Sequence, residues 1–172
     1  TLEQSLLFLC FYVKNLTGTI FTENTFDLDL VSSYVPWAEI PAGSGNWVSS
    51  PVSEGIVIED SDGAIFGENV VNATFGDVVG SYDTIYVVDV KGSDNAHIIS
   101  NDIKAKGNTY IYGIIASGNN LHINENTIFS EGNYYANGID IEGPATAVVE
   151  DNFISASAIS SAYAIYSGMN GQ

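Results

Sequence analysis

An asparagine that closes a short apolar segment returns along this chain at an almost constant interval. Asn101, Asn126 and Asn152 are 25 and 26 residues apart, and the second residue after each is apolar. A repeat period of about 20 to 50 residues is typical of solenoids, propellers and arrays, whose repeats stack on copies of themselves. The same position is found at Asn24, Asn69, Asn101, Asn126 and Asn152.

A second repeated signature is Gly-Ile-x-Ile, which is clearest at residues 138–141. Its first apolar position recurs at intervals of 26, 25 and 26 residues, at Val88, Ile114, Ile139 and Ile165, and Phe11 extends the column backwards. Both signatures alternate with the strand period of about two residues, and no stretch has a convincing helical period. We therefore predict an all-β fold: a single-stranded parallel β-helix (β-solenoid) of about five coils of ~25 residues, with coils ~4.8 Å apart.

The apolar residues of one coil are expected to point inward, and the repeated asparagines to form a ladder. In the fourth coil the inward residues are Ile114, Ala116, Leu121, Ile123 and Ile128. The asparagine is expected at a bend, because asparagine tolerates the left-handed backbone conformation better than most residues. Stacked in register, asparagines can join neighbouring coils through their side-chain amides. We therefore predict a structural role for all five.

The repeat spacing predicts one solenoid domain over residues 1–172, with a long loop insertion at about 30–54 and a smaller one at about 72–83. Three of the four prolines and both tryptophans fall in the long insertion. Long loops with their own chemistry often carry function. Trp37 and Trp47, with Tyr34 nearby, are therefore the candidate partner- or glycan-binding residues. The alternative is that they pack on the solenoid flank.

The charge of the chain limits its partners. Against 21 acidic residues there are four lysines and no arginine, which gives a net charge of −17. Such a chain repels phosphate backbones, so we expect no nucleic-acid partner, and anionic membranes and polyuronates are unfavourable for the same reason. Cations, cationic surfaces and neutral glycans remain as partners that this charge permits. No apolar run reaches the ~20 residues of a membrane span, and we expect residues 6–13 to form a strand.

The two repeat signatures resemble those of right-handed parallel β-helix proteins of the pectate-lyase-like superfamily. They are more closely similar to the asparagine-rich, acidic surface proteins of methanogenic archaea that are described as adhesin-like or sheath-forming. The residues that carry the resemblance are Asn-Thr-Ile at 126–128, Gly-Ile-x-Ile at 138–141 and their copies, over about residues 11–167 apart from the long insertion. The resemblance implies a parallel β-helix, an extracellular or cell-surface location and a structural or adhesive role.

We expect no catalytic residues. The lyases of that superfamily use basic residues, often with calcium, whereas this chain has no arginine and scattered lysines. Its hydrolases use clustered aspartates. Asp89 and Asp140 share one outward column, but they are two coils apart, at ~9–10 Å, with Ile115 between them. That separation is near the upper end for the carboxylate pair of an inverting glycosidase.

No metal site can be deduced from the sequence. His97 and His122 occupy the same outward position on adjacent coils, so their rings should lie ~5 Å apart. A firm metal site needs further ligands, and none is evident. Glu125 and Asp151 stack beside the repeated asparagines, but calcium takes about six to eight oxygen ligands and no closed set is visible. We expect no other cofactor, and calcium at this acidic edge is the one that we leave undecided.

Three further residues could carry covalent chemistry at a cell surface. Cys10 is the only cysteine, so it is either a small buried side chain or a candidate for an intermolecular disulfide. Asn15 and Asn72 begin Asn-x-Thr glycosylation sequons, and both are expected in turns or loops.

The leading functional hypothesis is a structural cell-surface protein that self-assembles into a sheath or surface-layer-like polymer. Neither end of the chain has an atypical capping repeat, and the chain begins with Thr1. We therefore expect either a fragment of a longer solenoid or a subunit that stacks end to end, as a homo-oligomer or polymer. The alternative is an adhesin domain that binds a glycan or host surface through the tryptophan loop. A polysaccharide-active enzyme is the third hypothesis.

Overall fold

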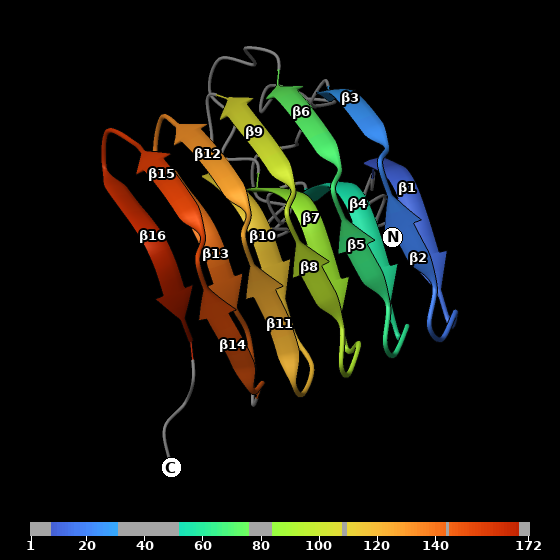
Figure 1. The fold of residues 1–172 in the computed structure, drawn as a ribbon. Coiled ribbons are helices and arrows are strands. Elements are labelled where there is room, and N and C mark those ends of the chain that lie inside the picture. Colours follow the sequence, from blue (N-terminus) through green and yellow to red (C-terminus); the bar gives the residue numbers. More distant parts are fainter. Residues whose placement is uncertain (1–7, 31–51, 76–83, 108–109, 144, 169–172) are drawn as a thin grey trace, which may run out of the picture.

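A computed structural model describes residues 8–30, 52–75, 84–107, 110–143 and 145–168, which form strands and turns. Three strands make up each coil, and each strand pairs in parallel with its equivalents in the neighbouring coils. The predicted parallel β-solenoid of about five coils is confirmed (Figure 1). The described residues include no helix that is long and apolar enough to cross a membrane.

Three parallel sheets run the length of the solenoid, and we name them A, B and C. Sheet A contains β1 (Phe8–Lys14), β4 (Val52–Glu59), β7 (Thr84–Lys91), β10 (Tyr110–Ala116), β13 (Tyr135–Ile141) and β16 (Ser161–Ser167). Sheet B contains β2 (Ile20–Thr22), β5 (Ile65–Gly67), β8 (His97–Ile99), β11 (Leu121–Asn124) and β14 (Ala147–Glu150). Sheet C contains β3 (Thr25–Leu30), β6 (Val70–Phe75), β9 (Asp102–Gly107), β12 (Thr127–Gly132) and β15 (Phe153–Ser157).

The repeat spacing sets the register of the sheets. Ile114 pairs with Val88 on one side and with Ile139 on the other, and Ile139 pairs with Ile165. The apolar residues that the alternation places inward are fully buried in a continuous core: Ile114, Ala116, Leu121, Ile123 and Ile128. Burying one such Leu or Ile side chain contributes about 1.5–3 kcal/mol, so stacked coils stabilise each other.

The repeated asparagines form an uninterrupted ladder between coils. In each step the Oδ1 atom of one asparagine accepts hydrogen bonds from both the backbone N–H and the side-chain amide of the asparagine in the preceding coil. The Asn126 amide also donates to the carbonyl of Ile98, at 2.8 Å. These bonds satisfy the polar groups at a corner where the chain turns from sheet B to sheet C.

The expectation that these asparagines adopt the left-handed conformation is wrong. The residue before each asparagine has the positive φ instead: Glu23, Glu68, Ser100, Glu125 and Asp151, at 54° to 59°. The side chain of Glu125 points to solvent, whereas Asn126 is 1% exposed and its amide is committed to the ladder. The turn therefore needs one residue in the left-handed region and a separate asparagine that points inward.

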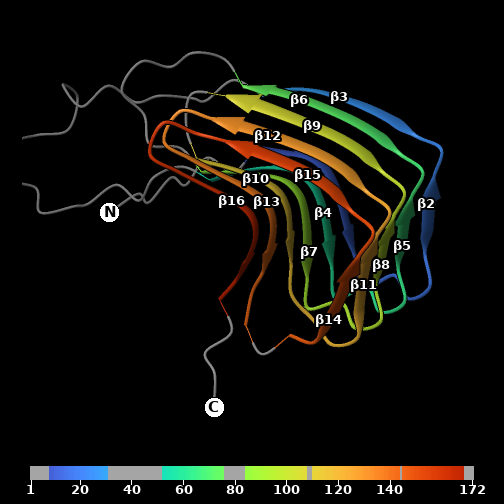
Figure 2. The same ribbon diagram turned by 60° about the vertical axis from the view of Figure 1, so that its left-hand side comes forward.

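Each strand of sheet A bends at one position. The pairing register skips one residue there, at Cys10, Gly55, Val87, Gly113, Gly138 and Ala164. Gly113 and Ile114 are consecutive and both face the core, which breaks the alternation and turns the strand. Figure 2 shows that β7, β10, β13 and β16 are bent and that the concave side of the bend faces away from sheets B and C.

At Gly113 and Gly138 the next coil is too close to leave room for a side chain. A Cβ atom on Gly113 would lie 2.8 Å from the carbonyl oxygen of Gly138, and one on Gly138 would lie 2.6 Å from that of Ala164. Real Cβ atoms do not approach a carbonyl oxygen so closely, and these carbonyls belong to backbone that cannot move aside. The bend therefore fixes the concave outer face of sheet A.

Candidate functional site

Tyrosine side chains gather on the outer face of sheet A. Seven of the ten tyrosines belong to outward positions of its strands: Tyr12, Tyr86, Tyr110, Tyr112, Tyr135, Tyr163 and Tyr166. Neighbouring rings lie in contact, with centroids 5.2 Å apart for Tyr86 and Tyr112 and 5.5 Å apart for Tyr112 and Tyr135. Burial raises the pKa of Tyr86, Tyr112 and Tyr135, so their hydroxyl groups remain protonated and can donate hydrogen bonds.

Two aspartates lie beside these tyrosines in one column of sheet A. Ile115 pairs with Asp89 in β7 and with Asp140 in β13, so the order is Asp89, Ile115, Asp140. Alternation alone places this column outward, yet the three residues are only 2%, 4% and 5% exposed. The bend explains the difference, because outward side chains on its two sides converge. The Asn137 amide, across the bend, donates to Asp140 Oδ2 at 3.0 Å.

Asp89 belongs to a small charged cluster with Lys91 and Glu54. The Lys91 ammonium forms an ion pair with Glu54 Oε1 and lies 3.1 Å from Asp89 Oδ2. Burial raises the pKa of Asp89 to about 7, although Lys91 opposes the rise. Burial alone would lower the pKa of Lys91, but its contacts with Glu54 and Asp89 raise it overall. Lys91 therefore stays charged between two carboxyl groups.

Asp140 has no ion-pair partner in the described part of the chain. Burial raises its pKa to about 6, and the hydrogen bond from Asn137 opposes that rise. Asn137 itself is completely buried, and its Oδ1 atom accepts no hydrogen bond. This face thus presents aromatic rings together with one buried oxygen, Asn137 Oδ1, that accepts no hydrogen bond.

The two imidazoles stack on the outer face of sheet B. His97 pairs with His122 in register, and their rings lie 4.8 Å apart and within 6° of parallel. Burial, with a smaller contribution from His122, lowers the pKa of His97. The same column continues with apolar residues that are 62% exposed at Ile20 and 45% exposed at Val148. Among the described residues, no group of three or more His, Cys, Asp or Glu could hold a metal ion.

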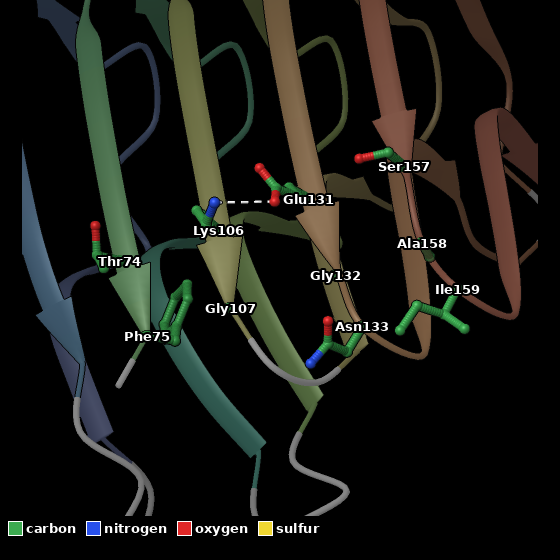
Figure 3. A pocket seen from close by; sticks show the side chains of 10 residues that line it. All are labelled: Thr74, Phe75, Lys106, Gly107, Glu131, Gly132, Asn133, Ser157, Ala158 and Ile159. Atoms are coloured by element: carbon green, nitrogen blue, oxygen red, sulfur yellow. Dashed lines mark hydrogen bonds and ion pairs between the residues drawn. The ribbon is translucent and has the colours of Figure 1, made fainter. Parts of the chain in front are cut away.

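A separate hollow of about 480 Å³ lies where the strands of sheet C end (Figure 3). Lys106 and Glu131, which form an ion pair at 2.9 Å, line it together with the apolar side chains of Phe75 and Ile159. Figure 3 shows the hollow crossing the ends of β6, β9, β12 and β15. None of the site residues predicted from the sequence lines it.

The structure places only some of the predicted site residues. Trp37, Trp47 and Tyr34 lie outside the described residues. Cys10 is within β1, at the bend position.

Asn15 is exposed in the turn after β1. The expectation that both sequons lie in turns or loops is wrong for Asn72, which is in the middle of β6 because residues 70–75 alternate as a strand. Its amide donates to Asp27 Oδ1 at 2.9 Å.

No protein-family model, curated protein or solved structure is significantly similar to this chain. The candidate site therefore rests on its own geometry. Sequence reasoning placed Asp89 and Asp140 in one outward column but assigned them no role, and it missed the tyrosine face and Asn137. The Tyr-x-Tyr at 110–112 and the Tyr135 that pairs with Tyr110 are the signal that could have found it.

Proposed function

We propose that this chain is a structural β-solenoid segment of an extracellular surface protein, and that separate copies assemble by stacking their coils end to end. The last described coil carries the proposal. Ile165 is 50% exposed, whereas Ile139 and Ile114, which precede it in the same inward column, are completely buried. An inward side chain of this kind becomes buried only when another coil covers it.

The backbone of the same coil is also available for pairing. Within the described residues, β14, β15 and β16 are outermost in sheets B, C and A. A strand at a sheet edge presents unpaired N–H and C=O groups, which template the addition of another strand. A coil that continues the existing register would pair these groups and bury Ile165 in one step.

The partner that we propose is the first coil of a second copy. Three of the inward positions of this coil are phenylalanines, and the ring centroid of Phe11 lies 5.4 Å from that of Phe21 and 5.6 Å from that of Phe26. Phe11 belongs to the column that ends at Ile165, and Phe26 belongs to the column of Ile154. Stacking would therefore place phenylalanine rings on exposed aliphatic side chains and continue both columns.

The extracellular location is supported by the sequence. A net charge of −17 keeps copies soluble and disfavours unspecific lateral association, while the sequons suit a cell-surface protein. The resemblance to the pectate-lyase-like superfamily, and more closely to acidic adhesin-like or sheath-forming archaeal surface proteins, also supports it.

We assign no catalytic step to the chain. Polysaccharide cleavage that Asp140→Asn abolishes would contradict this assignment.

Sedimentation and electron microscopy of the purified 172-residue chain test the proposal. We expect elongated oligomers that grow with concentration and disappear in Ile165→Glu, because a charge would be buried at each junction. Phe129→Glu is the control, since Phe129 is 39% exposed on the outer face of sheet C and lies between two other strands, away from both coil ends. A wild-type chain that stays monomeric, or oligomers that survive Ile165→Glu, would contradict end-to-end stacking.

A second candidate function is adhesion through a ligand-binding surface. The observation that favours it is the tyrosine face of sheet A, because paired aromatic rings stack on sugars and anchor partners. The tryptophan loop remains the other candidate surface. A glycan array with wild-type protein and with the Trp37→Ala/Trp47→Ala variant tests the loop: the adhesin hypothesis predicts binding that the variant loses.

A further inference from the structure

The outer face of sheet B is almost without charge, although the chain carries a net charge of −17. Its outward residues form two columns: Ile20, Ile65, His97, His122 and Val148, and beside them Thr22, Gly67, Ile99, Asn124 and Glu150. Glu150 is the only charged residue among them. The outer face of sheet C, by contrast, carries charges of both signs: Asp27, Asp102, Lys104, Lys106 and Glu131. Depletion of charge around exposed apolar side chains is typical of the centre of a protein–protein interface.

The lack of charge indicates which partner fits this face. A cationic partner would be attracted to the acidic turns and to the other faces, and an anionic partner is repelled by the chain as a whole. A second copy of the chain meets almost no like charge here, and identical surfaces pair about a two-fold axis. With the axis parallel to the strands and between β8 and β11, Val148 of one copy lies against Ile65 of the other. Glu150 then lies against Gly67 and meets no acidic residue.

The only two histidines of the chain lie at the centre of this arrangement. His97 pairs with His122 in register, and their rings lie 4.8 Å apart and within 6° of parallel. The two-fold axis places His97 of one copy opposite His122 of the other, so that four imidazoles gather around it. Packed sheets lie ~10 Å apart, and side chains from both faces meet midway. Four imidazole nitrogens are a ligand set that tetrahedral Zn²⁺ accepts.

One chain alone does not supply this ligand set. In the described part of the chain, no group of three or more His, Cys, Asp or Glu could hold a metal ion. Zinc binds imidazole nitrogen at ~2.0–2.1 Å, so two nitrogens on one ion lie at most ~4.2 Å apart. The parallel rings of His97 and His122 would therefore tilt toward each other on binding. The site is complete only when a second copy adds its pair.

We propose that two copies of this chain dock through the outer faces of sheet B and bind one Zn²⁺ ion between them, with His97 and His122 of each copy as ligands. The positive charge of the ion offsets part of the repulsion between two acidic chains, so the association depends on the metal. The surface is separate from the coil ends, so this contact does not rest on end-to-end stacking.

Sedimentation velocity of the Ile165→Glu variant measures the contact without end-to-end stacking, because that substitution lies at a coil end. We expect a monomer in EDTA and, in zinc chloride, a dimer with one zinc ion per two chains. His97→Ala/His122→Ala in the same background should stay monomeric at the same zinc concentration. A monomer in zinc, with or without bound ion, would overturn the proposal, and so would a dimer that survives the two alanine substitutions.

Calcium distinguishes imidazole ligands from carboxylates, because a chain with 21 acidic residues attracts any divalent cation. Calcium takes oxygen ligands, so calcium chloride should leave the chain monomeric. X-ray absorption spectroscopy of the zinc-bound dimer should show about four imidazole ligands at ~2.0–2.1 Å. A dimer in calcium, or a zinc ion surrounded by carboxylate oxygens, would show bridging by acidic residues and overturn the site.

A charge placed on the docking surface tests the contact with both histidines present. Val148 is 45% exposed, and Val148→Lys would bury an ammonium group against Ile65 of the other copy. We expect it to weaken the zinc-dependent dimer at least about tenfold. Phe129→Lys makes the same charge change at a residue that is 39% exposed on sheet C, and it should leave the dimer within about twofold. Equal effects of the two substitutions would overturn sheet B as the docking surface.

Discussion

One oxygen atom of Asn126 accepts two hydrogen bonds from Asn101. Its Oδ1 accepts the backbone N–H of Asn101 at 3.0 Å and the side-chain amide at 2.9 Å. Each coil therefore supplies the hydrogen-bond acceptor for the corner of the preceding coil. The asparagine ladder and the apolar columns thus favour the same register between coils. Loss of one asparagine leaves buried donors of a neighbouring coil without a partner.

Asn126→Ala should lower the free energy of unfolding by about 2–5 kcal/mol, because two buried donors of Asn101 lose their acceptor. Urea denaturation measures the change. Asn124→Ala, two residues earlier on the outward side of β11, is the control and should change stability by about 0.5 kcal/mol or less. An equal effect of the two substitutions would show that the ladder contributes nothing specific.

Gly138→Ala should destabilise the chain by about 3 kcal/mol or more, since its Cβ atom would lie 2.1 Å from Ile154 Cγ2 and 2.6 Å from the Ala164 carbonyl oxygen. The thermal unfolding midpoint is the measurement. For Gly168→Ala the nearest atom would be at 3.6 Å, an ordinary contact, so this control should unfold near the wild-type temperature. A tolerated Gly138→Ala would contradict the close approach of coils at the bend.

The buried carboxyl groups predict a stability that falls as the pH rises. Burial raises the pKa of Asp89 from 3.8 to about 7 and that of Asp140 from 3.8 to about 6. The folded chain therefore holds protons that the unfolded chain has released, and this contribution to stability is full below pH ~4 and lost by pH ~7. Asp89→Asn should raise the free energy of unfolding at pH 8 by on the order of 1–3 kcal/mol and reduce the pH dependence.

Urea denaturation between pH 4 and pH 8 measures this slope (the range follows the two pKa values). Asp151→Asn, in an exposed turn, is the control and should leave the slope unchanged. If Asp89→Asn destabilised the chain at pH 8, the Lys91 contact would outweigh the burial of Asp89, and the pKa of this carboxyl group would not be raised by burial.

The repeat period was enough to predict the fold and the register. Val88, Ile114, Ile139 and Ile165 stack because the chain length per coil is nearly constant, and that length can be read directly. The local backbone geometry was harder to predict from the sequence. The left-handed conformation belongs to Glu125 and its equivalents because the asparagine side chain is needed inside the coil.

The tyrosine face could not be predicted from alternation. The pattern gives the side of the sheet on which Asp89 and Asp140 lie, but not how deeply they are buried. Their burial depends on the bend, where Gly113 and Ile114 both face the core and Asn137 approaches Asp140 from the other side. A break in the alternation of one strand does not by itself show which side chains it buries. Their burial follows only from the positions of neighbouring columns in three dimensions.

Oxidative crosslinking between copies tests end-to-end stacking most directly. Asp27 and Ser155 belong to one column on the outer face of sheet C, in the first and the last described coil. Continued register would bring Ser155 of one copy to ~4.8 Å from Asp27 of the next, a Cα separation that a disulfide can span. Both variants also carry Cys10→Ser, because the native thiol is itself a candidate for a disulfide between copies. In this background we expect Asp27→Cys/Ser155→Cys to form a ladder of disulfide-linked oligomers on a non-reducing gel, and Asp27→Cys alone to form none beyond the dimer. Monomers in both lanes, at concentrations where the wild type sediments as oligomers, would contradict the proposed register of assembly.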